Sequence, residues 1–118
     1  MSLNPAFDEE KFNFKKVAEQ EILLKLQFED DTDITFIINK SPLTLYHTLI
    51  CPNVEKGLAQ RITLNSLRFC VDFLLSIEQN RYFRIGYNSP GALASVNHLH
   101  LHLMFVDKEL YVDRVVSF

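Results

Sequence analysis

Apolar and polar positions alternate in several short segments of the chain, and such alternation is typical of β-strands. These segments are rich in β-branched, leucine and aromatic residues and are separated by residues that favour turns. The pattern predicts strands over 21–28, 34–38, 47–51, 82–87 and 96–106. Pro52 is expected to stop the third strand, and 34–38 is expected to pair antiparallel with 47–51 through a 39–46 loop.

One segment between these strands has the spacing of an α-helix instead. Its apolar positions form one stripe, made of Leu64, Leu67, Val71, Leu74 and Leu75. The spacing predicts a helix over about 64–78, with Thr63 or Asn65 as its N-cap. Strands, one helix and further strands in this order predict an α+β fold, with a mainly antiparallel sheet of about five strands and one main helix packed on it.

Length and composition limit the classes of protein that fit this pattern. The chain has 118 residues, 47% of them hydrophobic, which predicts a single domain over 1–118 with residues 1–13 as an N-terminal arm. A net charge of −3 argues against a nucleic-acid partner, and no apolar run approaches the roughly 18 residues of a membrane span. Cys51 and Cys70 lack the spacing of a zinc motif, so we expect reduced thiols in a cytoplasmic protein.

Three of the four histidines fall within the last predicted strand, at positions 98, 100 and 102. Side chains two residues apart on a strand lie about 6.6 Å apart on the same face. The spacing therefore predicts that His98, His100 and His102 share a face with Met104, while the intervening leucines face the helix. Just upstream, the small-residue segment 91–95 ends in Ser95, which offers a hydroxyl and an amide to a ligand.

Three interpretations of this histidine row are open. A metal site would bind zinc or iron through ring nitrogens, with Asp107 or Glu109 as nearby carboxylates. A structural interpretation places the rings in a polar groove without chemistry. Nucleophilic catalysis at phosphorus would use one neutral imidazole to attack a phosphoryl group while a second ring hydrogen-bonds an oxygen. The third ring would then fix the tautomer of the nucleophile, directly or through a backbone carbonyl.

The segment His98-Leu99-His100-Leu101-His102-Leu103-Met104 resembles the HφHφHφφ signature of the histidine triad superfamily of nucleotidyl transferases and hydrolases, where φ is apolar. Within that superfamily, four segments are similar to the GDP-D-glucose phosphorylase family. They are 12–15 (FNFK), 38–43 (INKSPL), 83–89 (FRIGYNS) and 94–102 (ASVNHLHLH). The resemblance covers most of residues 12–105, and it implies a histidine-triad-like α+β fold.

The resemblance also implies a reaction, in which GDP-glucose and inorganic phosphate give GDP and glucose 1-phosphate without a cofactor or a metal. His100 would be the nucleophile and would hold the guanylyl group. Ser95 and His102 would contact the phosphate, and His98 would orient the end of the strand.

Three further residues are candidates for the site. Asn39 matches a position that meets the ribose, and Asn88 matches a position near the phosphate loop. His47 has either a local structural role or a supporting role near the pocket.

A homodimer is one expected arrangement, since superfamily members commonly dimerise through a sheet edge.

The family's chains are longer than this one, and its C-terminal half, which resembles a second copy of the fold and is expected to complete the pocket, is absent here. Two alternative functions follow. One is a truncated, inactive domain that binds nucleotide or interacts with partners. The other is a nucleotide hydrolase of the histidine triad type, in which water replaces phosphate as the second acceptor.

Overall fold

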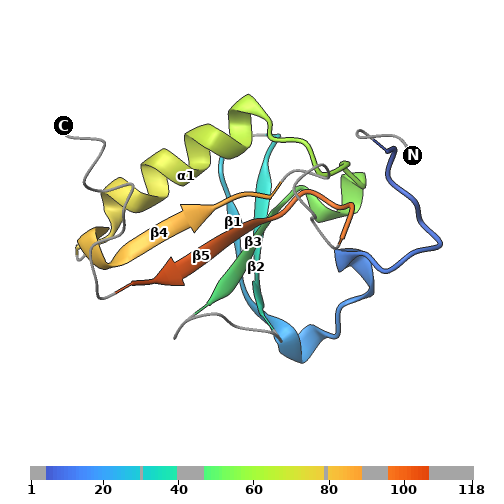
Figure 1. Ribbon diagram of the computed structural model, residues 1–118, viewed down its shortest axis with the longest axis horizontal. Helices are drawn as coiled ribbons and strands as arrows, with labels where there is room; N and C mark the ends of the chain where they lie inside the picture. Colours follow the sequence, from blue (N-terminus) through green and yellow to red (C-terminus); the bar gives the residue numbers. More distant parts are fainter. Residues whose placement is uncertain (1–4, 30, 40–46, 79, 89–95, 107–118) are drawn as a thin grey trace.

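The computed structural model describes residues 5–29, 31–39, 47–78, 80–88 and 96–106. Within these ranges the chain forms a five-stranded antiparallel sheet with the strand order β1-β2-β3-β5-β4, and one α-helix lies across one of its faces (Figure 1). The elements are β1 (Ile22–Gln27), β2 (Asp33–Ile38), β3 (Thr48–Pro52), α1 (Leu64–Ser76), β4 (Phe83–Gly86) and β5 (Leu101–Phe105). Single 3-10 turns lie at η1 (Phe14–Lys16), η2 (Glu19–Glu21), η3 (Val54–Lys56) and η4 (Asn80–Tyr82). The predicted α+β fold is confirmed.

The predicted antiparallel pair is present as β2 and β3, with Thr35 opposite Cys51. Pro52 is the last residue of β3, opposite Ile34, so the prediction that the strand stops before it was wrong by one residue. Most of the connecting loop, residues 40–46, lies outside the described residues. β5 pairs with β3 on one side and with β4 on the other, which places His102 between Leu49 and Gly86.

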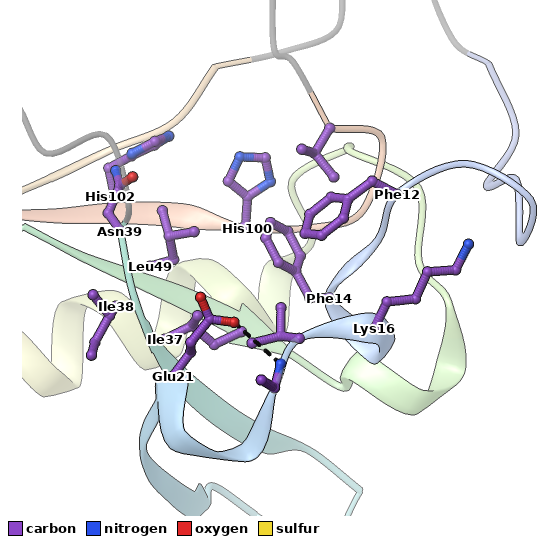
Figure 2. Close-up of a pocket in the computed structure, with 13 residues that line it drawn as sticks. Phe12, Phe14, Lys16, Glu21, Ile37, Ile38, Asn39, Leu49, His100 and His102 are labelled. Atoms are coloured by element: carbon purple, nitrogen blue, oxygen red, sulfur yellow. Dashed lines mark hydrogen bonds between the residues drawn. The ribbon is translucent and has the colours of Figure 1, made fainter.

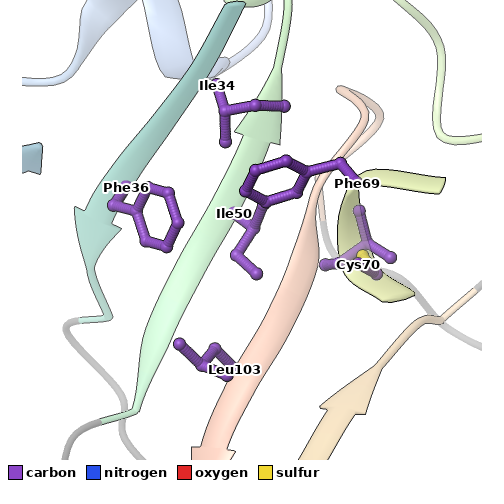
Figure 3. Close-up of a cluster of buried hydrophobic side chains, with 7 residues drawn as sticks. Ile34, Phe36, Ile50, Phe69, Cys70 and Leu103 are labelled. Carbon is purple, nitrogen blue, oxygen red and sulfur yellow. The ribbon is translucent and has the colours of Figure 1, made fainter. Parts of the chain in front are cut away.

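Alternation along the strands divides the apolar side chains between the two faces of the sheet. On the face covered by α1, strand and helix residues form one buried cluster (Figure 3). Its members are Ile34, Phe36, Ile50, Phe69, Cys70, Leu101 and Leu103. The leucines of β5 therefore face the helix, as the alternation predicts. Burial of such side chains stabilises the domain by about 1.5–3 kcal/mol each.

The helix turns a different face to the sheet from the one predicted. Phe69 and Cys70 are buried, and Phe73 and Leu74 pack against the same cluster. Of the predicted stripe only Leu74 does so, whereas Leu64, Leu67, Val71 and Leu75 are exposed. The helix has two apolar faces, and the aromatic one fills the space above Phe36, whose ring centroid lies 6.1 Å from that of Phe69.

The start of α1 agrees with the sequence. Thr63 is the N-cap, its hydroxyl oxygen accepting a hydrogen bond from the amide of Ser66 at 3.1 Å. The Ser66 hydroxyl in turn accepts from the Thr63 amide at 3.0 Å, which completes a capping box. The helix ends at Ser76, two residues before the predicted end. At 13 residues α1 is the longest helix in the described ranges, too short to cross a membrane.

The last strand is much shorter than predicted, because a loop takes the place of a neighbouring strand along residues 97–100. The amide of Leu99 donates to the carbonyl of Leu58 at 2.8 Å. The amide of Gln60 donates to the side chain of Asn97 at 2.9 Å. β5 therefore begins only at Leu101, and the segment that carries His98 and His100 precedes it.

Candidate active site

A pocket of about 510 Å³ opens on the sheet face opposite α1, where a second apolar cluster lies between the sheet and the N-terminal segment (Figure 2). It is lined by Phe12, Phe14, Lys16, Val17, Ala18, Glu21, Ile37, Ile38, Asn39, Leu49, Val96, His100 and His102. Ile37 and Leu49 belong to the second cluster and so join the pocket to the body of the domain. One face of the sheet thus packs against α1, and the other carries both the second cluster and the pocket.

His100 and His102 reach this pocket together, as the alternation about Leu101 predicts. Their ring centroids are 5.3 Å apart. The Phe14 ring approaches His100 edge-on from the other side, with centroids 5.1 Å apart, so that His100 stands between Phe14 and His102 (Figure 2). The pocket therefore combines an aromatic wall with two imidazoles.

His98 lies on the same side of the sheet, with its ring stacked on Phe14 at a centroid distance of 5.4 Å, but it does not line the pocket. Its side chain is 0% exposed. Nδ1 accepts a hydrogen bond from the amide of Phe14 at 2.9 Å, and Nε2 lies 3.1 Å from the carbonyl oxygen of Val54. Because Nδ1 accepts, the ring proton resides on Nε2 and is donated to Val54. Phe14 and Val54 thus hold the ring beside the pocket rather than in it.

The carbonyl of His98 fixes the tautomer of His100. Nδ1 of His100 lies 2.7 Å from that carbonyl oxygen, which can only accept, so Nδ1 carries the proton and Nε2 keeps its lone pair. The His100 ring is 4% exposed. Burial lowers the pKa of His100 below its usual 6.5 and keeps the ring neutral near pH 7. A neutral imidazole with a fixed Nδ1–H is a nucleophile at Nε2.

His102 forms a pair with His47, which the sequence left between a structural and a supporting role. Nε2 of His47 and Nδ1 of His102 are 2.8 Å apart, so one of the two nitrogens carries the shared proton. The side-chain nitrogen of Asn39 lies 3.0 Å from Nε2 of His47. Burial and the neighbouring rings of His100 and His47 lower the pKa of His102 to about 4, and burial also lowers the pKa of His47. His47 thus contacts His102 directly, and Asn39 contacts His47.

The N-terminal segment supports the site in a way that the sequence did not predict. Asn97 donates from its amide to the carbonyls of Pro5 at 3.1 Å and Ala6 at 2.7 Å, and the Phe7 ring contacts that of His98 with centroids 4.9 Å apart. Phe12, 57% exposed, stands at the rim of the pocket. The aromatic residues within the otherwise polar segment 1–13 are the feature of the sequence that could have indicated these contacts.

Of two other predicted site residues, Asn88 and Ser95, the structure describes only Asn88. Asn88 is exposed and does not line the pocket, although its carbonyl accepts a hydrogen bond from the side chain of Gln60 at 3.0 Å. Ser95 lies outside the described residues, as do Asp107 and Glu109. Their predicted contacts stay predictions. Among the residues that the structure describes, no three His, Cys, Asp or Glu side chains are grouped as metal ligands.

The fold and the site define the chain as an α+β domain with neutral imidazoles beside a pocket. A protein-family model described as "GDPGP1-like, N-terminal domain" matches residues 1–104. The chain therefore belongs to the GDPGP1-like family, and the predicted resemblance to GDP-D-glucose phosphorylases is confirmed.

Individual relatives agree with this assignment. GDP-D-glucose phosphorylase 1 of Macaca fascicularis is 42% identical, over 98% of this chain and 32% of the relative. The protein of that name from Danio rerio is 36% identical, over 96% and 33%. GDP-L-galactose phosphorylase 2 of Arabidopsis thaliana is 34% identical, over 94% and 30%. The chain spans about a third of the length of these curated relatives. No solved structure matches it significantly.

Proposed function

We propose that this domain carries the nucleotidyl-transfer centre of a GDP-hexose phosphorylase, with His100 as the nucleophile. The observation that carries the proposal is the 2.7 Å contact between Nδ1 of His100 and the carbonyl oxygen of His98. It assigns the proton to Nδ1 and the lone pair to Nε2, on a ring that lines the pocket. Two of the relatives named above are GDP-D-glucose phosphorylases and one is a GDP-L-galactose phosphorylase, which supports a GDP-hexose as the substrate.

The first step forms a bond between Nε2 of His100 and the α-phosphorus of GDP-glucose. The bond from that phosphorus to the bridging oxygen breaks, and its electron pair leaves with glucose 1-phosphate. His100 then carries the guanylyl group as an imidazolium, whose Nδ1–H remains donated to the carbonyl of His98. That carbonyl dipole stabilises the positive charge which develops during the attack.

The second step returns the enzyme to its starting state. An oxygen of inorganic phosphate attacks the same phosphorus, the bond to Nε2 breaks, and its electron pair returns to His100 as GDP leaves. Splitting one displacement into two in this way is the general advantage of a covalent intermediate. No proton has to enter or leave His100 in either step, which fits a ring whose pKa lies below the working pH.

His102 contacts the phosphate oxygens in this proposal, together with Ser95 as the family resemblance implies. Since its pKa is about 4, His102 is a neutral imidazole near pH 7. The side-chain nitrogen of Asn39 can only donate to Nε2 of His47, so Nδ1 of His102 carries the shared proton and Nε2 of His102 keeps a lone pair that can accept from a protonated phosphate oxygen. Asn39, which lines the pocket, meets the ribose.

The test is to incubate the full chain with GDP-glucose and inorganic phosphate and to measure GDP by chromatography, with GDP-L-galactose in a parallel reaction. We expect GDP from GDP-glucose, and loss of that product in His100→Asn at an unchanged urea midpoint. Activity retained in His100→Asn would overturn the nucleophile. GMP formed equally with and without phosphate would replace phosphorolysis by hydrolysis. A chain that neither reacts nor binds GDP would overturn the proposal altogether.

A further inference from the structure

Gln60 lies beside the backbone of His100, and its side chain makes three hydrogen bonds to backbone groups. It is 0% exposed. Its Oε1 accepts from the amide of His100 at 2.8 Å. Its Nε2 donates one hydrogen to the carbonyl of His100 at 3.0 Å and the other to the carbonyl of Asn88 at 3.0 Å. The carboxamide thus binds both backbone polar groups of His100, in the manner of a neighbouring strand.

Gln60 makes these hydrogen bonds to His100, the residue directly before β5 begins. In the described structure, residues 97–100, directly before β5, pair with no strand. The backbone of His100 therefore depends on the 58–60 loop for its hydrogen bonds. The loop is itself anchored: the Tyr87 hydroxyl donates to the carbonyl of Gln60 at 2.8 Å, and the Gln60 amide donates to the side chain of Asn97 at 2.9 Å. The backbone that carries the His100 ring is therefore fixed at both its amide and its carbonyl.

We propose that Gln60 is the positioning residue of the nucleophile: by holding the amide and the carbonyl of His100, it keeps Nδ1 on the carbonyl of His98 and Nε2 in line with the phosphorus. Gln60 does not line the pocket and so touches no substrate. The inference rests on the proposed function for its kinetic consequence, but the hydrogen-bond arrangement can be tested without turnover. Misplacing a reacting atom by about 1 Å costs about 100-fold in rate.

The donor and acceptor pattern makes the prediction specific to glutamine. In Gln60→Glu one carboxylate oxygen still accepts from the amide of His100, but the other faces two carbonyl oxygens and repels them. Protonating the introduced carboxyl replaces one of the two lost donors. The neighbouring titratable groups are His100, Tyr87 and the adjacent, exposed Arg61. The activity of this variant relative to the unmodified chain is therefore expected to rise as the pH falls from 8 to 6.

The experiment compares Gln60→Met, which removes the three hydrogen bonds, with Gln60→Glu and with the matched control Gln20→Glu at an exposed position. We expect kcat to fall about 100-fold in Gln60→Met with KM unchanged within a factor of two. Gln60→Glu should show a loss of similar size at pH 8 that shrinks toward pH 6, whereas Gln20→Glu should follow the unmodified chain at every pH.

A second measurement separates this inference from the proposed function. Long-range ¹H–¹⁵N spectra of the histidine rings report the tautomer without substrate. We expect a single Nδ1–H form of His100 in the unmodified chain and in Gln20→Glu, and a mixture of tautomers in Gln60→Met, or in Gln60→Glu at pH 8 if the methionine variant does not fold. An inactive unmodified chain would contradict the proposed function and leave this test intact. Unchanged kcat, or a single Nδ1–H form in the folded Gln60 variants, would overturn the role of Gln60.

Discussion

The buried ring of His98 makes a quantitative prediction about stability. In His98→Leu the side chain keeps a similar volume, so the variant removes the two hydrogen bonds of the ring with little additional cavity. The amide of Phe14 loses the acceptor that lies 2.9 Å away, in a place that water does not reach. The carbonyl of Val54 loses one donor but keeps the amide of Gly57 at 3.2 Å.

The expected magnitude follows from these two losses. An unsatisfied buried amide costs about 1–3 kcal/mol, and the carbonyl that keeps one partner should cost about 1 kcal/mol. We therefore expect His98→Leu to lower the free energy of unfolding by about 2–4 kcal/mol. Each kcal/mol corresponds to about 4 °C in Tm for a domain of this size, which gives a drop of about 8–16 °C.

Urea unfolding at pH 7 measures this change, with His102→Leu as the matched control. His102 is only half-buried, and its neighbour His47 keeps the contact with Asn39, so the control should lose no more than about 1 kcal/mol. Hydrogen exchange adds a local test, since protection of the Phe14 amide should fall more than that of Ile50 in the sheet. Equal stability losses in the two variants, or a loss below about 1 kcal/mol in His98→Leu, would refute the reasoning.

Three further predictions concern charge, strain and thiol chemistry. The histidine pKa values are lowered by burial, so the folded chain binds fewer protons than the unfolded chain. The contribution of these neutral histidines to the free energy of unfolding is therefore fully present above about pH 6.5 and is lost as the pH falls toward about 4. His102 contributes about 1–2 kcal/mol of it after its partial exposure is discounted. A urea midpoint that stays constant from pH 7 to 4.5 would contradict this. Gly57 has φ 61°, and a Cβ there would lie 2.9 Å from the Phe7 ring, so Gly57→Ala should cost at least about 1–2 kcal/mol by thermal unfolding. Burial raises the pKa of Cys51 and raises that of Cys70 to about 11, so neither thiol should react with a disulfide reagent at pH 8 until urea unfolds the chain, and fast labelling of the native protein would show the packing to be wrong.

The strands and the capped helix could be predicted because their signals are local. Period-two alternation fixed the positions of β2 and β3 to within one or two residues, and Thr63 marked the start of α1. The face of α1 that packs on the sheet could not be predicted in the same way, because Phe69 and Phe73 form a second apolar face beside the leucines. Which face packs depends on the shape of the sheet beneath it, and that shape comes from distant residues.

The site shows the same division between local and distant information. Alternation about Leu101 correctly placed His100 and His102 on one face. It did not show that His98 is buried outside the pocket, because the hydrogen bonds of its ring to Phe14 and Val54 join distant parts of the chain. The pairing of His47 with His102 depends on the register of β3 against β5, which joins residues 55 positions apart.

The central claim is that Nε2 of His100 captures the guanylyl group, and trapping the intermediate tests it most directly. The chain is mixed with GDP-glucose in the absence of inorganic phosphate, digested under alkaline conditions that preserve phosphoramidates, and mapped by tandem mass spectrometry. We predict one guanylyl group on His100, glucose 1-phosphate released in equal amount, and loss of the adduct as GDP when phosphate is added. An adduct on His102 or His47, or GDP formation without any covalent intermediate, would contradict the account.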